Sequence, residues 1–162
     1  MVPEAAGVAF ALRPMGLPDL PGVLALEREC FSPAHWSAES FRVMFDRASA
    51  VMLVALCPDG GLLGYAVAER ALDEAEVLKM AVRCDTRGRG LGRALLRALL
   101  GELRAHECVK VYLEVREGNH AARAMYGAEG FRRIGVRRDY YDAPRENAVT
   151  MSLELSSWSP GA

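Results

Sequence analysis

The clearest hydrophobic pattern in the chain lies in residues 91–103, where leucines recur every three or four positions and arginines fall on the opposite side. This spacing matches one face of an α-helix, so the segment predicts an amphipathic helix. Residues 109–115 instead alternate strictly between apolar and polar side chains, which predicts a strand with one buried face. A strand, a helix and a second strand in succession indicate a crossover that joins two parallel strands.

Shorter patterns complete the set of elements. Apolar runs predict six further strands, at residues 8–12, 50–56, 62–68, 75–82, 131–136 and 148–155. Asp19, Ser37 and Asn119 each precede a segment of helical periodicity and are predicted N-caps. Gly130 is the expected stop of the last helix. Four helices and seven strands follow from these signals.

The predicted order of elements is β, α, α, β, β, β, α, β, α, β, β. The connections PDGG and LDEA are short, which favours an antiparallel meander over residues 50–82. We therefore expect an α+β fold with a mixed, mostly antiparallel sheet of seven strands and about four helices. Because no repeat or linker interrupts the pattern, residues 1–155 are expected to form a single domain. Residues 156–162, SSWSPGA, are expected to form a flexible C-terminal tail.

Composition excludes several classes of protein. A chain of 162 residues supports one core, and 20 basic against 21 acidic side chains argue against nucleic-acid binding as the main function. No run approaches the ~18 apolar residues that span a bilayer, and the start lacks the features of a signal peptide. We therefore expect a soluble, cytoplasmic protein. Its four cysteines have no metal-ligand spacing, so they are expected to be reduced thiols, with no metal site.

The glycine-rich segment RGRGLGR, residues 87–93, follows a predicted strand and opens a predicted helix. Glycines let successive backbone N–H groups turn toward one point, and a helix N-terminus adds about half a positive charge. The segment therefore predicts an anion-binding loop. It is neither a Walker A loop, which needs Gly-Lys-Ser/Thr, nor a dinucleotide fingerprint, which needs glycine where Arg93 stands. An ordinary turn with solvated arginines is the alternative interpretation.

The spacing Arg/Gln-x-x-Gly-x-Gly/Ala is met by Arg87, Gly90 and Gly92. This loop resembles the acyl-CoA pyrophosphate loop of the GNAT N-acetyltransferase superfamily, and the predicted order of elements is similar along nearly the whole chain. The segments ERECFSPAHWSAESF, LGRALL, YLEVREGNHAARAMYGAEGF and RRDYY resemble the RimI type, which acetylates the N-terminal alanine of a ribosomal protein. The resemblance implies a GNAT fold in which the parallel central strands splay apart.

The resemblance also implies roles for single residues. It implies that Glu114 accepts a proton and that Tyr126 donates one to the departing thiolate. It implies that acetyl-CoA is bound by Met80, Ala81 and Val82 along its pantetheine arm, by Gly88, Arg89, Gly90, Leu91, Gly92 and Arg93 at its pyrophosphate, and by Asn119. Taken singly, Glu114 is an ordinary surface carboxylate and Tyr126 a core tyrosine. Their joint register with the glycine loop favours the catalytic interpretation.

The chemistry of amines bears on the acceptor. An α-amino group has a pKa of about 7.7–8.0 and lysine about 10.4, so far more of the α-amine is neutral and reactive near pH 7. A carboxylate acting through water therefore suits a protein N-terminus. Together with the resemblance, this leads us to expect an acetyl-CoA-dependent N-terminal acetyltransferase that acts on the N-terminal alanine of a small-subunit ribosomal protein. We expect a monomer or weak dimer without nucleic-acid or membrane partners. The alternatives are a lysine or small-molecule amine as acceptor, and a non-catalytic acyl-CoA-binding module.

Overall fold

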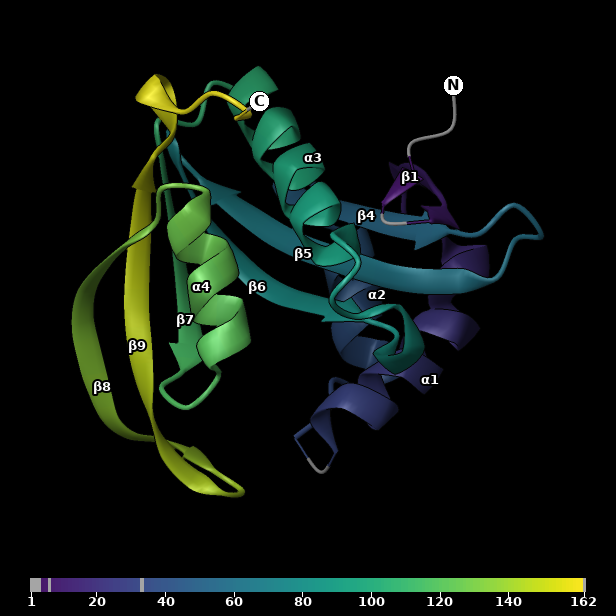
Figure 1. Cartoon of the computed structure of the whole chain (residues 1–162), viewed down its shortest axis with the longest axis horizontal. Helices are drawn as coiled ribbons and strands as arrows, with labels where there is room; N and C mark the ends of the chain where they lie inside the picture. The colour runs from purple at the N-terminus through teal and green to yellow at the C-terminus, as the bar shows by residue number, and fades with distance from the viewer. Residues whose placement is uncertain (1–3, 6, 33, 162) are drawn as a thin grey trace.

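Figure 1 shows the computed structural model of the chain, which describes residues 4–5, 7–32 and 34–161. Its centre is a seven-stranded mixed sheet in the order β3-β4-β5-β6-β7-β9-β8. The strands of this sheet are β3 (Ala11–Pro14), β4 (Ala50–Leu56), β5 (Leu62–Ala71), β6 (Glu74–Val82), β7 (Lys110–Arg116), β8 (Arg132–Asp142) and β9 (Arg145–Glu154). The helices are α1 (Leu20–Phe31), α2 (Ala38–Phe45), α3 (Leu91–Ala105) and α4 (His120–Ala128). The predicted α+β class and mostly antiparallel sheet are confirmed.

Helices cover both faces of the sheet (Figure 1). The leucine stripe of α3 and Tyr126 of α4 pack on one face in a core with Val111 and Leu113 of β7. Helices α1 and α2 pack on the other face, over β4 and β5. Six leucines of α3 are fully or almost fully buried, namely Leu91, Leu95, Leu96, Leu99, Leu100 and Leu103. The helix predicted from the leucine spacing is therefore confirmed, with its apolar face against the sheet.

The first and the eighth strands differ from their predicted bounds. The predicted strand over 8–12 is interrupted at Phe10, whose ring is buried in the core, so that β2 (Val8–Ala9) pairs with β1 (Glu4–Ala5) and β3 joins the main sheet. Strand β8 continues six residues beyond the predicted end at 136. Its added part is polar because β8 is an edge strand, mostly exposed, and therefore lacks the hydrophobic alternation of an inner strand.

Two of the three predicted N-caps are confirmed. The backbone N–H of Ser40 donates to Ser37 Oγ at 3.2 Å, and that of Ala122 donates to Asn119 Oδ1 at 3.2 Å. Asp19 precedes α1, but its carboxylate does not cap that helix. It accepts hydrogen bonds from the Arg13 guanidinium and from the Gly16 N–H instead, because a 3-10 turn, η1 (Leu17–Asp19), leads into α1. The helix stop is also confirmed, since Gly130 has a φ of +103°.

The C-terminal segment is more closely packed than predicted. A 3-10 turn, η3 (Leu155–Ser157), follows β9, and Trp158 beyond it is buried in the core that includes α3. The Trp158 carbonyl accepts a hydrogen bond from Arg104 at 2.8 Å. The predicted boundary between domain and tail at residue 155 therefore lies too early, because the aromatic ring extends the folded part at least to Trp158.

Strands β6 and β7 form the parallel pair of the sheet, and they separate partway along. They pair only from Glu74 to Val77 of β6 and from Lys110 to Leu113 of β7. A bulge in the pairing of β5 with β6 lies at Leu78, the residue directly after the last β6 residue that pairs with β7. Bulges increase local twist and bend a strand, which turns the second half of β6 away from β7. The predicted splay is confirmed, and it leaves one backbone edge of β6 without a partner strand.

Two further observations concern the described part of the chain. None of its helices is both long and apolar enough to cross a membrane. Across residues 4–5, 7–32 and 34–161, no three His, Cys, Asp or Glu side chains gather in an arrangement that could hold a metal ion.

Candidate functional site

The N-terminus of α3 presents a run of unused backbone donors. Within the described residues, the N–H groups from Gly88 to Arg93 donate to no protein acceptor, and the next one, Ala94, donates to the Gly90 carbonyl at 3.0 Å. Gly88 and Gly90 have φ values of +74° and +83°, in the left-handed region that favours glycine. Consecutive free N–H groups at a helix N-terminus provide both donors and a partial positive charge for an anion.

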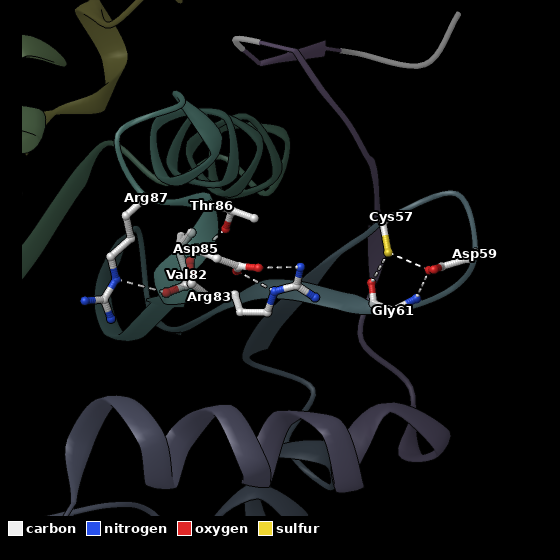
Figure 2. A network of polar contacts seen from close by, with 8 residues as sticks. All are labelled: Cys57, Asp59, Gly61, Val82, Arg83, Asp85, Thr86 and Arg87. Atoms are coloured by element: carbon white, nitrogen blue, oxygen red, sulfur yellow. Dashed lines mark hydrogen bonds and ion pairs between the residues drawn. The ribbon is translucent and has the colours of Figure 1, made fainter.

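The turn that leads into this loop is braced by its own side chains, as Figure 2 shows. Thr86 Oγ1 donates to the Arg83 carbonyl at 2.8 Å, and Arg87 Nε donates to the Val82 carbonyl at 3.2 Å. The Arg83 guanidinium also pairs with Asp85 at 2.7 Å. Protein contacts alone therefore set the path of the loop, so that little order has to be imposed when a ligand binds.

The second half of β6 offers backbone groups beside this loop. The Arg83 N–H donates to the Leu63 carbonyl at 2.7 Å, so the alternation of an antiparallel pair directs the peptide groups of Ala81 toward β5 as well. Those of Met80 and Val82 consequently point to the side from which β7 has separated. Of the three β6 residues predicted to bind acetyl-CoA, two present their backbone to the open side and Ala81 does not.

Tyr126 on α4 directs its hydroxyl toward this edge. The hydroxyl oxygen lies 4.0 Å from the Met80 sulfur, and the ring packs edge-on against Phe131 with centroids 5.7 Å apart. Burial, with a smaller contribution from Tyr141, raises the pKa of Tyr126 to about 12. Its hydroxyl therefore stays protonated at neutral pH and remains a hydrogen-bond donor.

Glu114 lies on β7 with its side chain on the sheet face opposite α4. Its carboxylate pairs with Arg137 Nε at 2.9 Å and its side chain is 14% exposed. A hydrogen bond to this carboxylate raises the pKa of the Tyr140 hydroxyl. Burial, followed by the charge of Glu114, raises the pKa of Tyr141 to about 12, and Tyr141 in turn affects Tyr126. Glu114 and Tyr126 therefore both interact electrostatically with Tyr141, on β8.

A pocket of about 530 Å³ adjoins Glu114. Its charged lining residues are the carboxylates Glu69, Glu74, Glu76 and Glu114 and the guanidiniums Arg70 and Arg137. Burial, followed by repulsion from Glu114, raises the pKa of Glu76. An excess of carboxylates attracts cations, so this pocket suits a protonated amine or a basic side chain better than an anion.

Asn119 has a structural use that limits its predicted role. Its side-chain oxygen accepts the capping hydrogen bond from Ala122, so its amide NH₂ is the part that remains for contact with acetyl-CoA. The Arg93 side chain is likewise engaged, because its Nε lies 2.5 Å from the Glu129 carboxylate. The backbone N–H of Arg93 is unaffected by this ion pair.

A buried polar cluster near β6 was not predicted. Glu27 on α1 is fully buried and accepts hydrogen bonds from the Tyr65 hydroxyl and, at 2.9 Å, from the Trp36 N–H. Lys79 Nζ lies 2.8 Å from the same carboxylate. The sequence does contain a signal, because Glu27 stands four residues after Val23, on the apolar side of the helix. This cluster fixes the segment between α1 and α2 against β6.

Comparisons with known proteins agree with the fold. The model of the acetyltransferase (GNAT) family matches residues 20–131. The [ribosomal protein bS18]-alanine N-acetyltransferase of Escherichia coli K12 is 34% identical over 140 residues, which cover 85% of this chain and 93% of the relative. The crystal structure of the ribosomal-protein-S18-alanine N-acetyltransferase from Escherichia coli superposes with a TM-score of 0.83 at 30% identity, over 94% of this chain and 96% of that one.

A third comparison concerns the fold alone. Arabidopsis thaliana NAA60 in complex with acetyl-CoA superposes with a TM-score of 0.81 at 21% identity, over 90% of this chain and 99% of that chain. The family match and the identity to the bacterial relative agree with the motifs in residues 87–93 and 112–131. They show that the chain belongs to the GNAT family of N-acetyltransferases.

Proposed function

We propose that the chain transfers an acetyl group from acetyl-CoA to the α-amino group of an N-terminal alanine, on a ribosomal protein of the small subunit. The observation that most directly supports acetyl-CoA is the set of free N–H groups from Gly88 to Arg93 beside the open edge of β6. A diphosphate can accept hydrogen bonds from the free N–H groups, and an extended, amide-containing chain can pair with the open edge of β6. The acceptor is proposed from the similarity to the Escherichia coli relative. Such a substrate would place the reaction in the cytoplasm.

The residues that would hold acetyl-CoA are set out along α3 and β6. The backbone N–H groups of residues 88–93 bind the diphosphate, the Met80 and Val82 backbone aligns the pantetheine arm, and the Asn119 NH₂ group adds a contact. When bound, acetyl-CoA supplies the acetyl group as an activated thioester. The N–H groups of residues 88–93 donate to no protein acceptor among the described residues, whereas the Val82 carbonyl already accepts a hydrogen bond from Arg87 Nε, which the pantetheine arm would share or displace.

Glu114 and Tyr126 provide the two proton transfers. Glu114, through a water molecule, accepts the proton that the acceptor amine loses as its nitrogen bonds to the acetyl carbon. Tyr126 donates a proton to the sulfur as the carbon–sulfur bond breaks, and solvent later restores it. Because burial raises the pKa of Tyr126 to about 12, the group is fully protonated near neutral pH and ready to donate.

The pocket beside Glu114 supports a second candidate. Its excess of carboxylates would also attract a lysine side chain or a polyamine. The pKa difference between the two kinds of amine favours the N-terminus, because a lysine must first lose a proton that it holds about 2.4 pH units more tightly. The α-amine therefore remains the preferred acceptor.

A peptide panel tests these candidates. The protein is incubated with acetyl-CoA and short peptides that differ only at the first residue, and released thiol is followed. We expect turnover with N-terminal alanine and none when that N-terminus is blocked. Turnover only with a blocked peptide containing lysine, or with spermidine, would establish the second candidate. Coenzyme binding without turnover on any amine would instead indicate an acyl-CoA-binding module.

Replacing Tyr126 with phenylalanine should lower kcat about 100-fold, because a general acid typically contributes 10²- to 10⁴-fold. The dissociation constant of CoA, measured by calorimetry, should change less than about twofold, since the buried ring is retained. In the wild-type enzyme, Tyr126 should cause no loss of activity on the alkaline side until pH approaches its pKa of about 12. A folded variant with wild-type kcat would remove Tyr126 from the reaction.

A further inference from the structure

Glu129, the residue that follows α4, has a buried carboxylate that the mechanism does not use. Its side chain is 2% exposed. It accepts hydrogen bonds from Arg93 Nε at 2.5 Å, Arg97 Nε at 2.8 Å and Trp158 Nε1 at 3.4 Å. Burial alone would raise the pKa of Glu129, but the hydrogen bonds from these three residues have the larger combined effect. The pKa of Glu129 is therefore lower than its usual value. The carboxylate is therefore charged at neutral pH and well supplied with donors.

The donors connect parts of the protein that are distant in sequence. Arg93 lies in the first turn of α3, next to the free N–H groups of the proposed diphosphate loop. Trp158 comes from the segment after β9. Glu129 itself follows Tyr126 by three residues, and its N–H donates to the Tyr126 carbonyl at 3.1 Å. One carboxylate thus links the first turn of α3 to the end of α4 that holds the proposed proton donor.

A second contact lies beside this link. Gly92 packs so closely against α4 that a methyl group in its place would lie 3.3 Å from the Met125 sulfur. The first turn of α3 therefore meets α4 through Gly92 and through the side chain of Arg93. Because the Arg93 guanidinium is bound to Glu129, its charge lies at the contact between the two helices. Within the described part of the chain, the backbone N–H of Arg93 is free of protein acceptors independently of this ion pair.

We propose that Glu129 is a positioning residue, which fixes the distance between the diphosphate loop and the Tyr126 hydroxyl. This inference rests on the proposed function. The coenzyme arm has a fixed number of bonds and is held extended along β6 in the proposed function, so its sulfur reaches Tyr126 only if the loop and α4 keep their relative positions. Misplacement of reacting groups by about 1 Å can lower a rate about 100-fold.

The test compares Glu129→Gln, which keeps the shape but removes the charge, with Glu102→Gln, an exposed carboxylate on α3. All measurements are made well below the melting temperature of each variant. For Glu129→Gln we expect about tenfold lower kcat and about tenfold weaker CoA binding by calorimetry, with an unchanged KM for the acceptor peptide. The Glu102→Gln control should match the wild type in all three.

A purely stabilising role predicts a different result. Glu129→Gln would then lower the melting temperature while kcat and CoA affinity stayed at wild-type values, and this outcome would overturn the inference. As a second criterion, Glu129→Gln introduced into Tyr126→Phe should cause little additional loss of kcat, because the group to be aligned is already gone. A further tenfold loss in that background would contradict the inference.

The inference can still be tested if Glu129→Gln does not fold or if the wild-type chain is inactive. If Glu129→Gln does not fold, Arg93→Met breaks the same link from α3 and should weaken CoA binding in the same direction; wild-type affinity in that variant would refute the link. If the wild-type chain acetylates no amine, the proposed function fails. The calorimetric comparison of CoA binding still decides whether Glu129 orders the loop.

Discussion

Replacing Glu114 with glutamine should lower kcat/KM by about 10²- to 10³-fold at pH 7, within the 10²- to 10⁴-fold that a general acid or base typically contributes. The loss should diminish as pH rises from about 7 to 9.5, because above the α-amine pKa of about 7.7–8.0 most of the acceptor is already neutral. A pH profile of kcat/KM with an alanine peptide measures this. The ion pair that is lost is minor for stability, since Arg137 is 61% exposed and such pairs contribute at most about 1 kcal/mol.

The control for this prediction is Glu102→Gln, which removes an exposed carboxylate from α3, outside the pocket that adjoins Glu114. It should leave kcat within about twofold of the wild type. A loss for Glu114→Gln that stays constant across the pH range, together with a raised peptide KM, would show that Glu114 binds the acceptor and does not deprotonate it.

Replacing Gly90 with valine should weaken CoA binding by at least about 100-fold, the second large effect that the structure predicts. Gly90 has a φ of +83°, where a β-branched residue is strained by roughly 1–3 kcal/mol. The backbone of the turn should change conformation to relieve this strain, so the N–H groups at the start of α3 would no longer point toward the diphosphate. Each charge-assisted hydrogen bond contributes about 1.5–3 kcal/mol, so the loss of two accounts for the expected change. Calorimetric titration with CoA gives the value directly.

Gly101→Ala provides the matched control, because Gly101 lies in the same helix and, apart from the neighbouring backbone of α3, no described atom comes within 4 Å of an added β-carbon. Alanine there should stabilise α3 by up to about 1 kcal/mol and leave CoA binding unchanged. The buried leucines of α3 should keep Gly90→Val folded, which circular dichroism and the melting temperature will check. Unchanged CoA affinity in a folded Gly90→Val protein would mean that the diphosphate does not bind at this loop.

Local patterns in the sequence predicted the elements that depend on local physics. The leucine spacing of α3 determines which face is buried, and the strict alternation of β7 places Glu114 on the polar face of its strand. Glycines with positive φ and the first turn of a helix are likewise local features, so the backbone geometry of residues 87–93 could be predicted from the sequence. The motifs around Glu114 and Tyr126 then supplied the family.

Features that depend on distant contacts were not predicted. Arg137 lies on the same face of the sheet as Glu114 because the pairing of β8 with β9 shifts between Arg133 and Gly135, and the alternation of the sequence does not reveal this shift. Glu129 looks like an ordinary helix-end carboxylate in sequence, yet its donors come from two distant parts of the chain, α3 and the segment after β9. Trp158 appeared to lie in a tail for the same reason, since its burial depends on a surface formed by α3.

The early separation of β6 from β7 has a consequence for the free enzyme. Each of these strands has a stretch of polar backbone in the middle of the sheet that pairs with nothing on one side, although such interior edges normally template aggregation. A ligand that runs along β6 occupies one of these edges in the way an additional strand would. The coenzyme should therefore protect the protein against self-association, so that the empty enzyme is the form most prone to misassembly during storage or heating.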